Sequence, residues 1–311
     1  MPLLCAIIDV GSNTMRLTLY YYEQTRFQPL LHKKAMAGLM GYVENGRLSD
    51  DGLRKAAEVL AEYRRILENF SVEEVHVFAT AILRNIGNSD QALAFLRDQS
   101  GFDIELISGE REAELDFLGA THYFDAREGL VVDIGGGSTQ LVVFREGRIL
   151  ASDSLPAGSL NTYSRRVGGL FPTDKERKDI VSRMQEALGG LSLRKQAKGM
   201  TICGVGGTIR ACLRLCKGLY DSERREPTLS PEDLSRLVAF SKEDNLKSRV
   251  KTLAKILPDR IHTFTPGLLL LSTIVREWDC PLVMVSDFGV REGYLIDRLQ
   301  RTASAKGAQL P

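Results

Sequence analysis

The chain has 311 residues, of which 43% are hydrophobic and 26% charged, a composition typical of a folded globular protein with two domains of ordinary size. Its 41 Lys and Arg residues balance 40 Asp and Glu residues, so a net charge of +1 creates no general field that would attract nucleic acid or an anionic membrane. Any chemistry on an anionic substrate must therefore depend on a local site.

The cysteines and the apolar segments indicate the compartment. The five cysteines form an odd and scattered set, which favours reduced structural thiols over disulfides or a zinc site. The first residues, MPLLCAIIDVGS, contain neither the basic region nor the cleavage sequence of a signal peptide. The longest apolar run, PGLLLLSTIV, is shorter than the ~20 residues of a membrane-spanning helix. The sequence predicts a cytoplasmic protein with no nucleic-acid or membrane partner.

Strands and helices alternate in the first half of the chain. The continuous apolar run 3–9 predicts a buried strand, and a hairpin and third strand follow over 15–22 and 27–34. The helical spacing of apolar residues predicts a helix over 48–70 with Ser49 as its cap, and Asn88 is the expected cap of a helix that ends at Gly101. Strands are expected at 75–80 and 103–107, and a helix with Ser108 at its start covers 108–124.

The same order begins again in the second half. A strand, a glycine turn and a second strand occupy 130–144, followed by helices over 159–168 and 173–189. The strand 200–205 leads through a glycine turn into a helix, and further helices are expected near 230–240, 245–256 and 265–277. A strand at 282–286 and a helix from 290 to about 301 complete an α/β chain.

An internal repeat relates the two halves. IIDVGSNTMRLTLY, from residue 7, and VVDIGGGSTQLVVF, from residue 131, share an apolar pair, an Asp, a Gly, small residues and a hydroxyl before a second strand. We interpret them as the starts of two related α/β domains, 1–122 and 123–311, that face each other across a cleft. The last helix, near 290–301, is expected to pack back on the first domain.

The glycine turns predict phosphate binding. Backbone N–H groups in such turns can converge on an anion, and glycine lets a phosphate oxygen come close. The turn before the helix near 209 would add a helix N-terminus that favours negative charge. The alternative is a set of tight hairpins that merely require positive φ. The predicted phosphate-binding residues of the three turns are Gly11, Ser12, Asn13, Thr14, Gly135, Gly136, Gly137, Ser138, Thr139, Gly206, Gly207 and Thr208.

Seven segments carry a resemblance to a known family. They are IDVGSNTMRL, FATAILR, ISGEREAEL, VVDIGGGSTQL, LPAG, GVGGT and GVREGYL, in this order along nearly the whole chain. The chain resembles the exopolyphosphatase and guanosine pentaphosphate phosphohydrolase (Ppx/GppA) family, within the actin, Hsp70 and sugar-kinase superfamily. ISGEREAEL just before DIGGGST separates this family from actins, chaperones and kinases. The resemblance implies two actin-like, ribonuclease H-like α/β domains, in a short form without additional C-terminal helical domains.

The resemblance also implies residue roles. Glu112 matches the proposed catalytic base, which must lie within about 3 Å of the attacking water; Glu110 is the second candidate. The plain alternative is that Glu110, Glu112 and Glu114 are first-turn acids that match the helix dipole. Arg84 would bind two phosphate oxygens, or else form a surface ion pair.

A metal site is implied at the strand ends. Asp133 is expected to bind Mg²⁺ or Mn²⁺, with Asp9 as its counterpart in the first domain and Gln140 as a further oxygen ligand. The family usually has Glu at the position of Gln140. Removing a unit charge ~4 Å from a cation costs at most ~4 kcal/mol at an effective dielectric constant of ~20, and a third of that weakens binding about tenfold. Two further departures remove basic residues: the segment 36–46 has no cation, and Asn161 lies near an expected Arg.

Three functions remain open at this point. The first is a Mg²⁺-dependent phosphohydrolase that releases terminal orthophosphate from inorganic polyphosphate or guanosine pentaphosphate, with Glu112 orienting the water. The second is a polyphosphate- or alarmone-binding sensor with little turnover, favoured by Gln140 and the missing cations. A small-molecule kinase is weaker, because no acceptor-activating Asp is evident. The sequence leaves the preferred substrate, the chain length and the oligomeric state open, a homodimer included.

Overall fold

The computed structural model describes residues 3–23, 26–70, 72, 74–124 and 126–305. The chain divides into two compact units, of which unit 1 contains residues 1–112 and 291–311 and unit 2 contains 113–290. The sequence placed the boundary after residue 122. In the structure the chain passes from one unit to the other inside two helices, at 112/113 and at 290/291.

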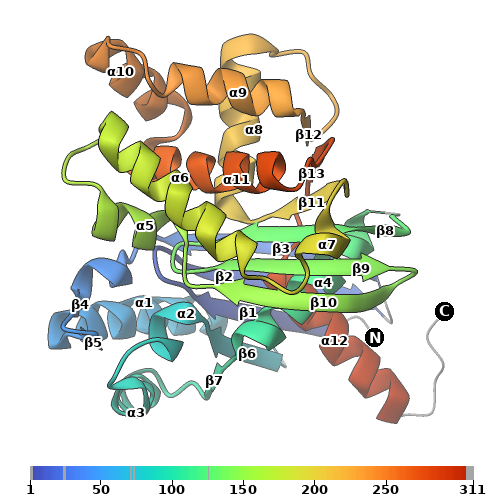
Figure 1. The fold of residues 1–311 in the computed structure, drawn as a ribbon. Coiled ribbons are helices and arrows are strands. Elements are labelled where there is room, and N and C mark those ends of the chain that lie inside the picture. Colours follow the sequence, from blue (N-terminus) through green and yellow to red (C-terminus); the bar gives the residue numbers. More distant parts are fainter. Residues whose placement is uncertain (1–2, 24–25, 71, 73, 125, 306–311) are drawn as a thin grey trace. The chain divides into compact units, whose positions relative to one another are not determined.

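Unit 1 is built on a five-stranded sheet with the order β3-β2-β1-β6-β7 (Figure 1). Its first three strands form an antiparallel meander, and β6 and β7 run parallel to β1. The bounds are β1 Leu3–Val10, β2 Met15–Glu23, β3 Arg26–Ala35, β6 Glu74–Ala79 and β7 Ile104–Leu106, with a separate small pair β4 Val43–Glu44 and β5 Arg47–Leu48.

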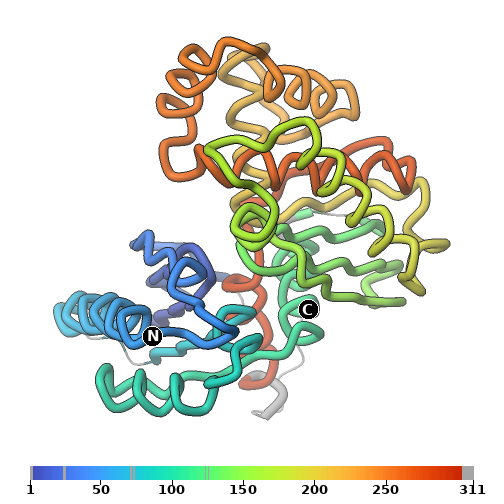
Figure 2. The backbone as a smooth tube through the Cα atoms, turned by 60° about the vertical axis from the view of Figure 1, so that its left-hand side comes forward, coloured from blue at the N-terminus to red at the C-terminus, as the bar shows by residue number. Residues whose placement is uncertain are grey.

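Helices cover both faces of this sheet because its central strands are apolar on both sides. Ala6, Ile8 and Val10 face a core shared with the two helices that Figure 2 shows side by side, α1 and α3. Phe78 points to the other face and stacks on Tyr294 of α12. The helices are α1 Asp50–Glu68, α2 Ala81–Arg84, α3 Ser89–Ser100, the start of α4 Gly109–Tyr123, and α12 Val290–Ala305, with a 3-10 helix η1 Leu39–Tyr42.

Unit 2 repeats the same sheet with one more strand, in the order β10-β9-β8-β11-β13-β12. The first three strands again form an antiparallel meander, and β11 and β13 run parallel to β8. The bounds are β8 Glu128–Ile134, β9 Thr139–Arg145, β10 Arg148–Leu155, β11 Ile202–Val205, β12 Thr228–Leu229 and β13 Val283–Val285.

Successive residues of β8 point to opposite faces of the sheet of unit 2. Val131 packs against α4, together with Val142 and Phe144 of β9. Leu130 and Val132 instead belong to the larger core of the unit, into which α6, α8, α9 and α11 pack. The helices are α5 Ser159–Arg166, α6 Asp174–Gly189, α7 Arg194–Ala197, α8 Gly206–Tyr220, α9 Pro231–Phe240, α10 Leu246–Ile256, η2 Pro258–Arg260 and α11 Phe264–Glu277.

The predicted repeat is present in the backbone. Gly11 N–H donates to the Thr14 carbonyl in the β1–β2 turn, and Gly135 N–H donates to the Ser138 carbonyl in the β8–β9 turn. Both hairpins lie at the same place in sheets of the same strand order. The chain therefore consists of two related α/β units of the actin-like type.

The structure corrects one helix cap. Asn88 occupies the N-cap position of α3, but its side chain makes no capping bond. Its amide instead accepts from the Leu48 N–H at 3.0 Å and donates to the Leu48 carbonyl at 2.9 Å. This paired contact fixes the start of α3 to β5, and it uses the side chain that a cap would need.

All five cysteines are free and buried. Among the described residues, no helix combines the length and the apolar character that a membrane span requires.

Candidate active site

Unit 1 brings two of the predicted site residues together. Arg84, at the end of α2, donates from Nη1 to a carboxylate oxygen of Glu112 in the first turn of α4, at 3.0 Å. The same nitrogen donates to the Ile107 carbonyl, also at 3.0 Å. No other hydrogen bond of the Arg84 guanidinium is found in the described part of the chain, so its remaining N–H groups are available to a ligand.

Burial distinguishes Glu112 from its neighbours on α4. Glu112 is 8% exposed, whereas Glu110 and Glu114 are exposed. Ser108 caps the helix through a bond from the Arg111 N–H. A carboxylate that only complemented the helix dipole would not need to be buried against an arginine, so Glu112 differs in this respect from Glu110 and Glu114.

In the first glycine turn, between β1 and β2, two polar residues accept hydrogen bonds through their backbone carbonyls from the segment around η1. Ser12 is buried, and its carbonyl accepts from the Met40 N–H at 3.0 Å, while the Asn13 carbonyl accepts from the Gly38 N–H at 3.0 Å. A Cβ on Gly11 would lie 2.9 Å from the Thr14 carbonyl oxygen, so the turn itself requires glycine here.

Asp9 ends β1 beside two cations. Burial raises the pKa of its carboxyl group, and the nearby charges of Arg291 and Arg16 oppose that effect. Arg16 lies opposite Asp9 in the β1–β2 register. The two arginines, only partly offset by the charge of Glu292, would weaken the binding of a divalent cation at Asp9.

Two side chains brace the second glycine turn, which lies between β8 and β9: Thr139, which is a predicted phosphate-binding residue, and Asn161, which is not. Thr139 is fully buried and donates its hydroxyl to the Ala157 carbonyl. Asn161, at the position of an expected Arg, donates to the carbonyls of Gly137 and Pro156 at 3.2 and 2.8 Å. A Cβ on Gly158 would lie 2.4 Å from the Gly136 carbonyl carbon. The turn is therefore packed tightly against the start of α5.

Asp133 approaches the third turn. A Cβ on Gly206 would lie 2.0 Å from Asp133 Oδ1, and Gly206 has a φ of +85°. Glycine is therefore required both by the backbone conformation and by a carboxylate of the protein itself. The Gly206–Thr208 turn opens α8, so its N–H groups lie at the positive end of a helix dipole.

Gln140 lies opposite Asp133 in the β8–β9 register. It is 1% exposed, and its amide nitrogen donates to the hydroxyls of Ser138 at 2.8 Å and Ser154 at 3.3 Å. Its amide oxygen has no hydrogen-bond partner among the described residues. An unsatisfied buried oxygen costs about 1–3 kcal/mol, so a ligand with a positive charge or a proton donor is expected at this position.

These groups fit a hard divalent cation. Asp133 and Gln140 present a carboxylate and an amide oxygen across one pair of strands, and oxygen ligands are what Mg²⁺ prefers. Asp9 has no such oxygen opposite it, because Arg16 takes the equivalent position. Asp133 and Gln140 thus offer two oxygen ligands where Asp9 offers one, and all three remain candidate metal ligands.

Arg260 was missed by the sequence analysis. It follows α10 in η2, is 9% exposed, and its guanidinium makes no hydrogen bond or ion pair within the described residues. A Cβ on Gly207 would lie 1.9 Å from Arg260 Nη2, so the guanidinium rests directly on the third turn. Burial and, to a smaller extent, the charges of Arg210 and Arg214 lower its pKa to about 10, against the opposing charges of Asp259 and Asp133.

A buried guanidinium that makes no hydrogen bond among the described residues and lies next to backbone N–H groups is a candidate anion site, and the carboxylates of Asp133 and Asp259 balance only part of the surrounding positive charge. Sequence pattern could not reveal it, because the motif PDRIHTF has no distinctive spacing and Arg260 lies more than 50 residues after the glycines.

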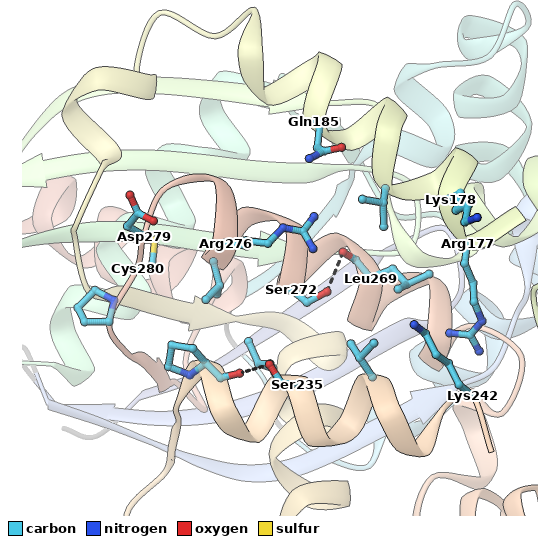
Figure 3. A pocket seen from close by; sticks show the side chains of 16 residues that line it. Arg177, Lys178, Gln185, Ser235, Lys242, Leu269, Ser272, Arg276, Asp279 and Cys280 are labelled. Carbon is cyan, nitrogen blue, oxygen red and sulfur yellow. Dashed lines mark hydrogen bonds between the residues drawn. The ribbon is translucent and has the colours of Figure 1, made fainter. Parts of the chain in front are cut away.

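A separate groove in unit 2 contains none of the predicted site residues. It lies between α6, α9 and α11 and has a volume of about 790 Å³. Figure 3 shows Arg177, Lys178 and Lys242 at one end, and Asp279 and Cys280 at the other. The candidate phosphate site is thus distinct from this groove.

The duplicated sheet with its two glycine hairpins is the fold of the actin-like class. The sequence pattern of the Ppx/GppA phosphatase family matches residues 21–302, and the chain belongs to this family.

Individual relatives match over nearly the full length. The chain is 28% identical over 299 residues to a Haemophilus influenzae protein provisionally named an exopolyphosphatase, covering 93% of this chain and 90% of that protein. The crystal structure of an Aquifex aeolicus Ppx/GppA family member is 26% identical, covers 97% of this chain and 99% of that chain, and has a TM-score of 0.80. An exopolyphosphatase structure from Cytophaga hutchinsonii, 22% identical with a TM-score of 0.85 over 98% of this chain and 99% of that one, shares the fold.

Proposed function

We propose that this protein is an exopolyphosphatase-type phosphohydrolase that releases terminal orthophosphate from inorganic polyphosphate, from guanosine pentaphosphate, or from both. Family membership and the name of the Haemophilus relative support the reaction class. The observation that carries the proposal is Arg260, a buried guanidinium that makes no hydrogen bond among the described residues and lies against the Gly206–Thr208 turn.

Unit 2 would hold phosphate groups of the substrate. The N–H groups at the start of α8, the hydroxyl of Thr208 and the guanidinium of Arg260 all favour phosphate oxygens. The Thr208 hydroxyl is buried and has no hydrogen-bond partner in the described part of the chain. A phosphate oxygen would satisfy both groups, and their fixed positions would stabilise charge that develops during the reaction.

Unit 1 would supply the general base. Glu112 is held by Arg84, and a carboxylate held in this way can orient a water molecule and accept its proton. The unused N–H groups of Arg84 would contact phosphate oxygens of the substrate. The predicted base and the predicted phosphate-binding arginine would thus act as a pair.

A divalent cation, Mg²⁺ or Mn²⁺, would be held by Asp133 and Gln140. When bound, such an ion neutralises phosphate charge and polarises the bond that breaks. Gln140 provides an oxygen but no charge, so its contribution to binding is smaller than that of a carboxylate.

The direct test is phosphate release by Glu112→Gln. The substitution keeps the shape of the side chain but removes the proton acceptor, and we expect release from polyphosphate and from guanosine pentaphosphate to fall by about 100-fold or more. Glu110→Gln is measured in parallel, because Glu110 lies exposed on the same helical turn and is the second candidate base; a loss confined to Glu112→Gln assigns the role to Glu112. Equal activity of Glu112→Gln and the wild type would remove Glu112 from the mechanism.

A second candidate function is a polyphosphate- or alarmone-binding sensor with little turnover, and Gln140 is the observation that favours it. Gln140→Glu distinguishes the two. In an enzyme with a weakened metal site, a carboxylate here should lower the Mg²⁺ concentration needed for activity about tenfold or more and raise the rate. Gln91→Glu, an exposed change of the same charge in unit 1, is the control. Tight binding by calorimetry without phosphate release in either protein would favour the sensor.

A further inference from the structure

Parallel pairing of two strands in unit 1 brings together three metal-ligating side chains that are far apart in sequence. Cys5 of β1 lies opposite Glu74 of β6 in the strand register. Glu74 and His76 are two residues apart on β6 and therefore share one face of the sheet. Cys5 shares this face because side chains opposite each other in paired strands point to the same side.

The three ligand atoms form a compact group. Cys5 Sγ, a carboxylate oxygen of Glu74 and a ring nitrogen of His76 all lie within 4.8 Å of one another. Cys5 is 1% exposed, and His76 is half-buried. His76 Nε2 is buried without a hydrogen bond, although a Glu74 oxygen lies 3.5 Å away. A cation with bonds of zinc length would draw such ligand atoms to about 3.3–3.8 Å from each other, which requires only small side-chain rotations.

We propose that Cys5, Glu74 and His76 form a zinc-binding site with three protein ligands and one position open to water. Sulfur, imidazole nitrogen and carboxylate oxygen together are the ligands that Zn²⁺ takes in proteins, whereas Mg²⁺ prefers oxygen alone. The site lies in the sheet of unit 1 and uses none of the residues assigned to phosphate hydrolysis.

Three side chains surround the site and would affect its affinity for a metal ion. Arg298 of α12 contacts a Glu74 oxygen at 3.5 Å, and the Tyr22 hydroxyl donates to the other oxygen at 3.3 Å. The Tyr294 ring lies against the His76 ring, with centroids 5.6 Å apart. The Arg298 guanidinium competes directly with a cation for Glu74, and its partly exposed side chain can turn into solvent when metal binds.

Cobalt substitution tests the site in the full-length protein. Chelator-treated protein is titrated with Co²⁺, and thiolate ligation is read from the sulfur-to-cobalt charge-transfer band in the near ultraviolet. Co²⁺ at the oxygen ligands Asp133 and Gln140 gives no such band. We expect the band in the wild type and in Cys203→Ser, a control at another cysteine that is 1% exposed, and its loss in Cys5→Ser.

Zinc affinity provides an independent measurement. Competition with a chromophoric chelator should show Zn²⁺ binding at least about tenfold weaker in Cys5→Ser and in His76→Gln than in the wild type. Arg298→Met should bind Zn²⁺ more tightly, because it removes the competing cation and leaves the three ligands intact. A wild type without the charge-transfer band at excess Co²⁺, or a band that survives in Cys5→Ser, would overturn the proposal. Either result leaves the phosphohydrolase proposal untouched.

Discussion

Arg260 and Arg177 are both buried arginines of unit 2, but they differ in how their guanidinium groups are satisfied. Arg177 donates to the Pro172 carbonyl, the Ser241 hydroxyl and the Ser241 carbonyl. Arg260 has no such bonds among the described residues, and burial lowers its pKa to about 10. The first arginine therefore stabilises the fold through its hydrogen bonds, while the second makes none and is offset only in part by the charges of Asp133 and Asp259.

This contrast gives a prediction for two matched variants. Arg260→Met should weaken polyphosphate binding about tenfold or more while leaving the free energy of unfolding unchanged or raising it by about 1–4 kcal/mol without ligand. Arg177→Met should destabilise the protein by about 1.5–3 kcal/mol, since it leaves two carbonyls and a hydroxyl without their donor. Urea unfolding and calorimetric titration measure the two effects. An equal loss of stability in both variants would contradict an anion-binding role for Arg260.

The glycines of the third turn have two explanations, the close approach of a phosphate and the packing of the protein's own side chains. The sequence analysis explained them by the close approach of a phosphate. In the structure, Asp133 occupies the space beside Gly206, and Arg260 occupies the space beside Gly207. The turn thus accommodates a carboxylate and a guanidinium of the protein, and these two side chains are the groups that a cation and a phosphate would meet.

At the level of elements, two helices of unit 2 begin with the same device. α6 and α9 both have a capping box, formed by Thr173 with Glu176 and by Ser230 with Asp233. Only Asp233 also forms a two-bond ion pair, with Arg224 Nη1 and Nη2 at 2.7 and 3.1 Å. Because both helices have the same type of cap, a comparison of substitutions at Glu176 and Asp233 measures what the ion pair with Arg224 adds to stability.

We predict that Asp233→Ala costs about 1.5–3 kcal/mol of unfolding free energy, because it removes two charge-assisted hydrogen bonds from Arg224 as well as the cap, while Asp221 still pairs with Arg224. Glu176→Ala should cost only about 1 kcal/mol, the usual value of a cap. Burial opposes ionisation of Asp233, but bonds from Arg224 and Ser230 outweigh it and hold the pKa below its ordinary value of 3.8. The ion pair's contribution is therefore present above pH 3.8 and lost as the pH falls through the folded-state pKa. Equal costs at neutral pH would show that Arg224 contributes nothing.

Local pattern predicted the long elements well and the short ones poorly. The helix at 48–70 and the strand at 3–9 agree with α1 and β1, including the Ser49 cap, which accepts from the Gly52 N–H. The two-residue strand β12 was missed because it exists only through pairing with β13. The strand β10 was not assigned either, since RILASDSL has no clear alternation, and its pairing with β9 defines it.

On the scale of the whole molecule, each unit has its own hydrophobic core. Ile8 belongs to the core of unit 1, and Leu271 belongs to the core of unit 2. The single tryptophan, Trp278, is buried in unit 2, so its fluorescence reports the folding of that unit. Units with separate cores are expected to respond separately to core substitutions.

We therefore predict that Ile8→Ala and Leu271→Ala affect different transitions. Each should cost about 2–5 kcal/mol in its own unit. Leu271→Ala should lower the urea midpoint of Trp278 fluorescence, whereas Ile8→Ala should lower the midpoint by circular dichroism with a smaller change in fluorescence. Equal displacement of the fluorescence midpoint by both variants would indicate one cooperative unit.

The sequence alone determined the α/β class, the duplication and the family, because periodicity and motif order are properties of neighbouring residues. It also singled out Glu112, Asp133 and the glycine turns as candidates. The assignments of their roles remain predictions.

The tertiary structure decided which side chains meet. The pairing of Arg84 with Glu112, the position of Arg260 on Gly207, and the approach of Cys5 to His76 each join segments separated by many residues. Such contacts depend on strand register and helix packing, which no local pattern records. Burial is likewise a property of the folded chain, and it distinguishes Glu112 from its exposed neighbours on the same helical turn.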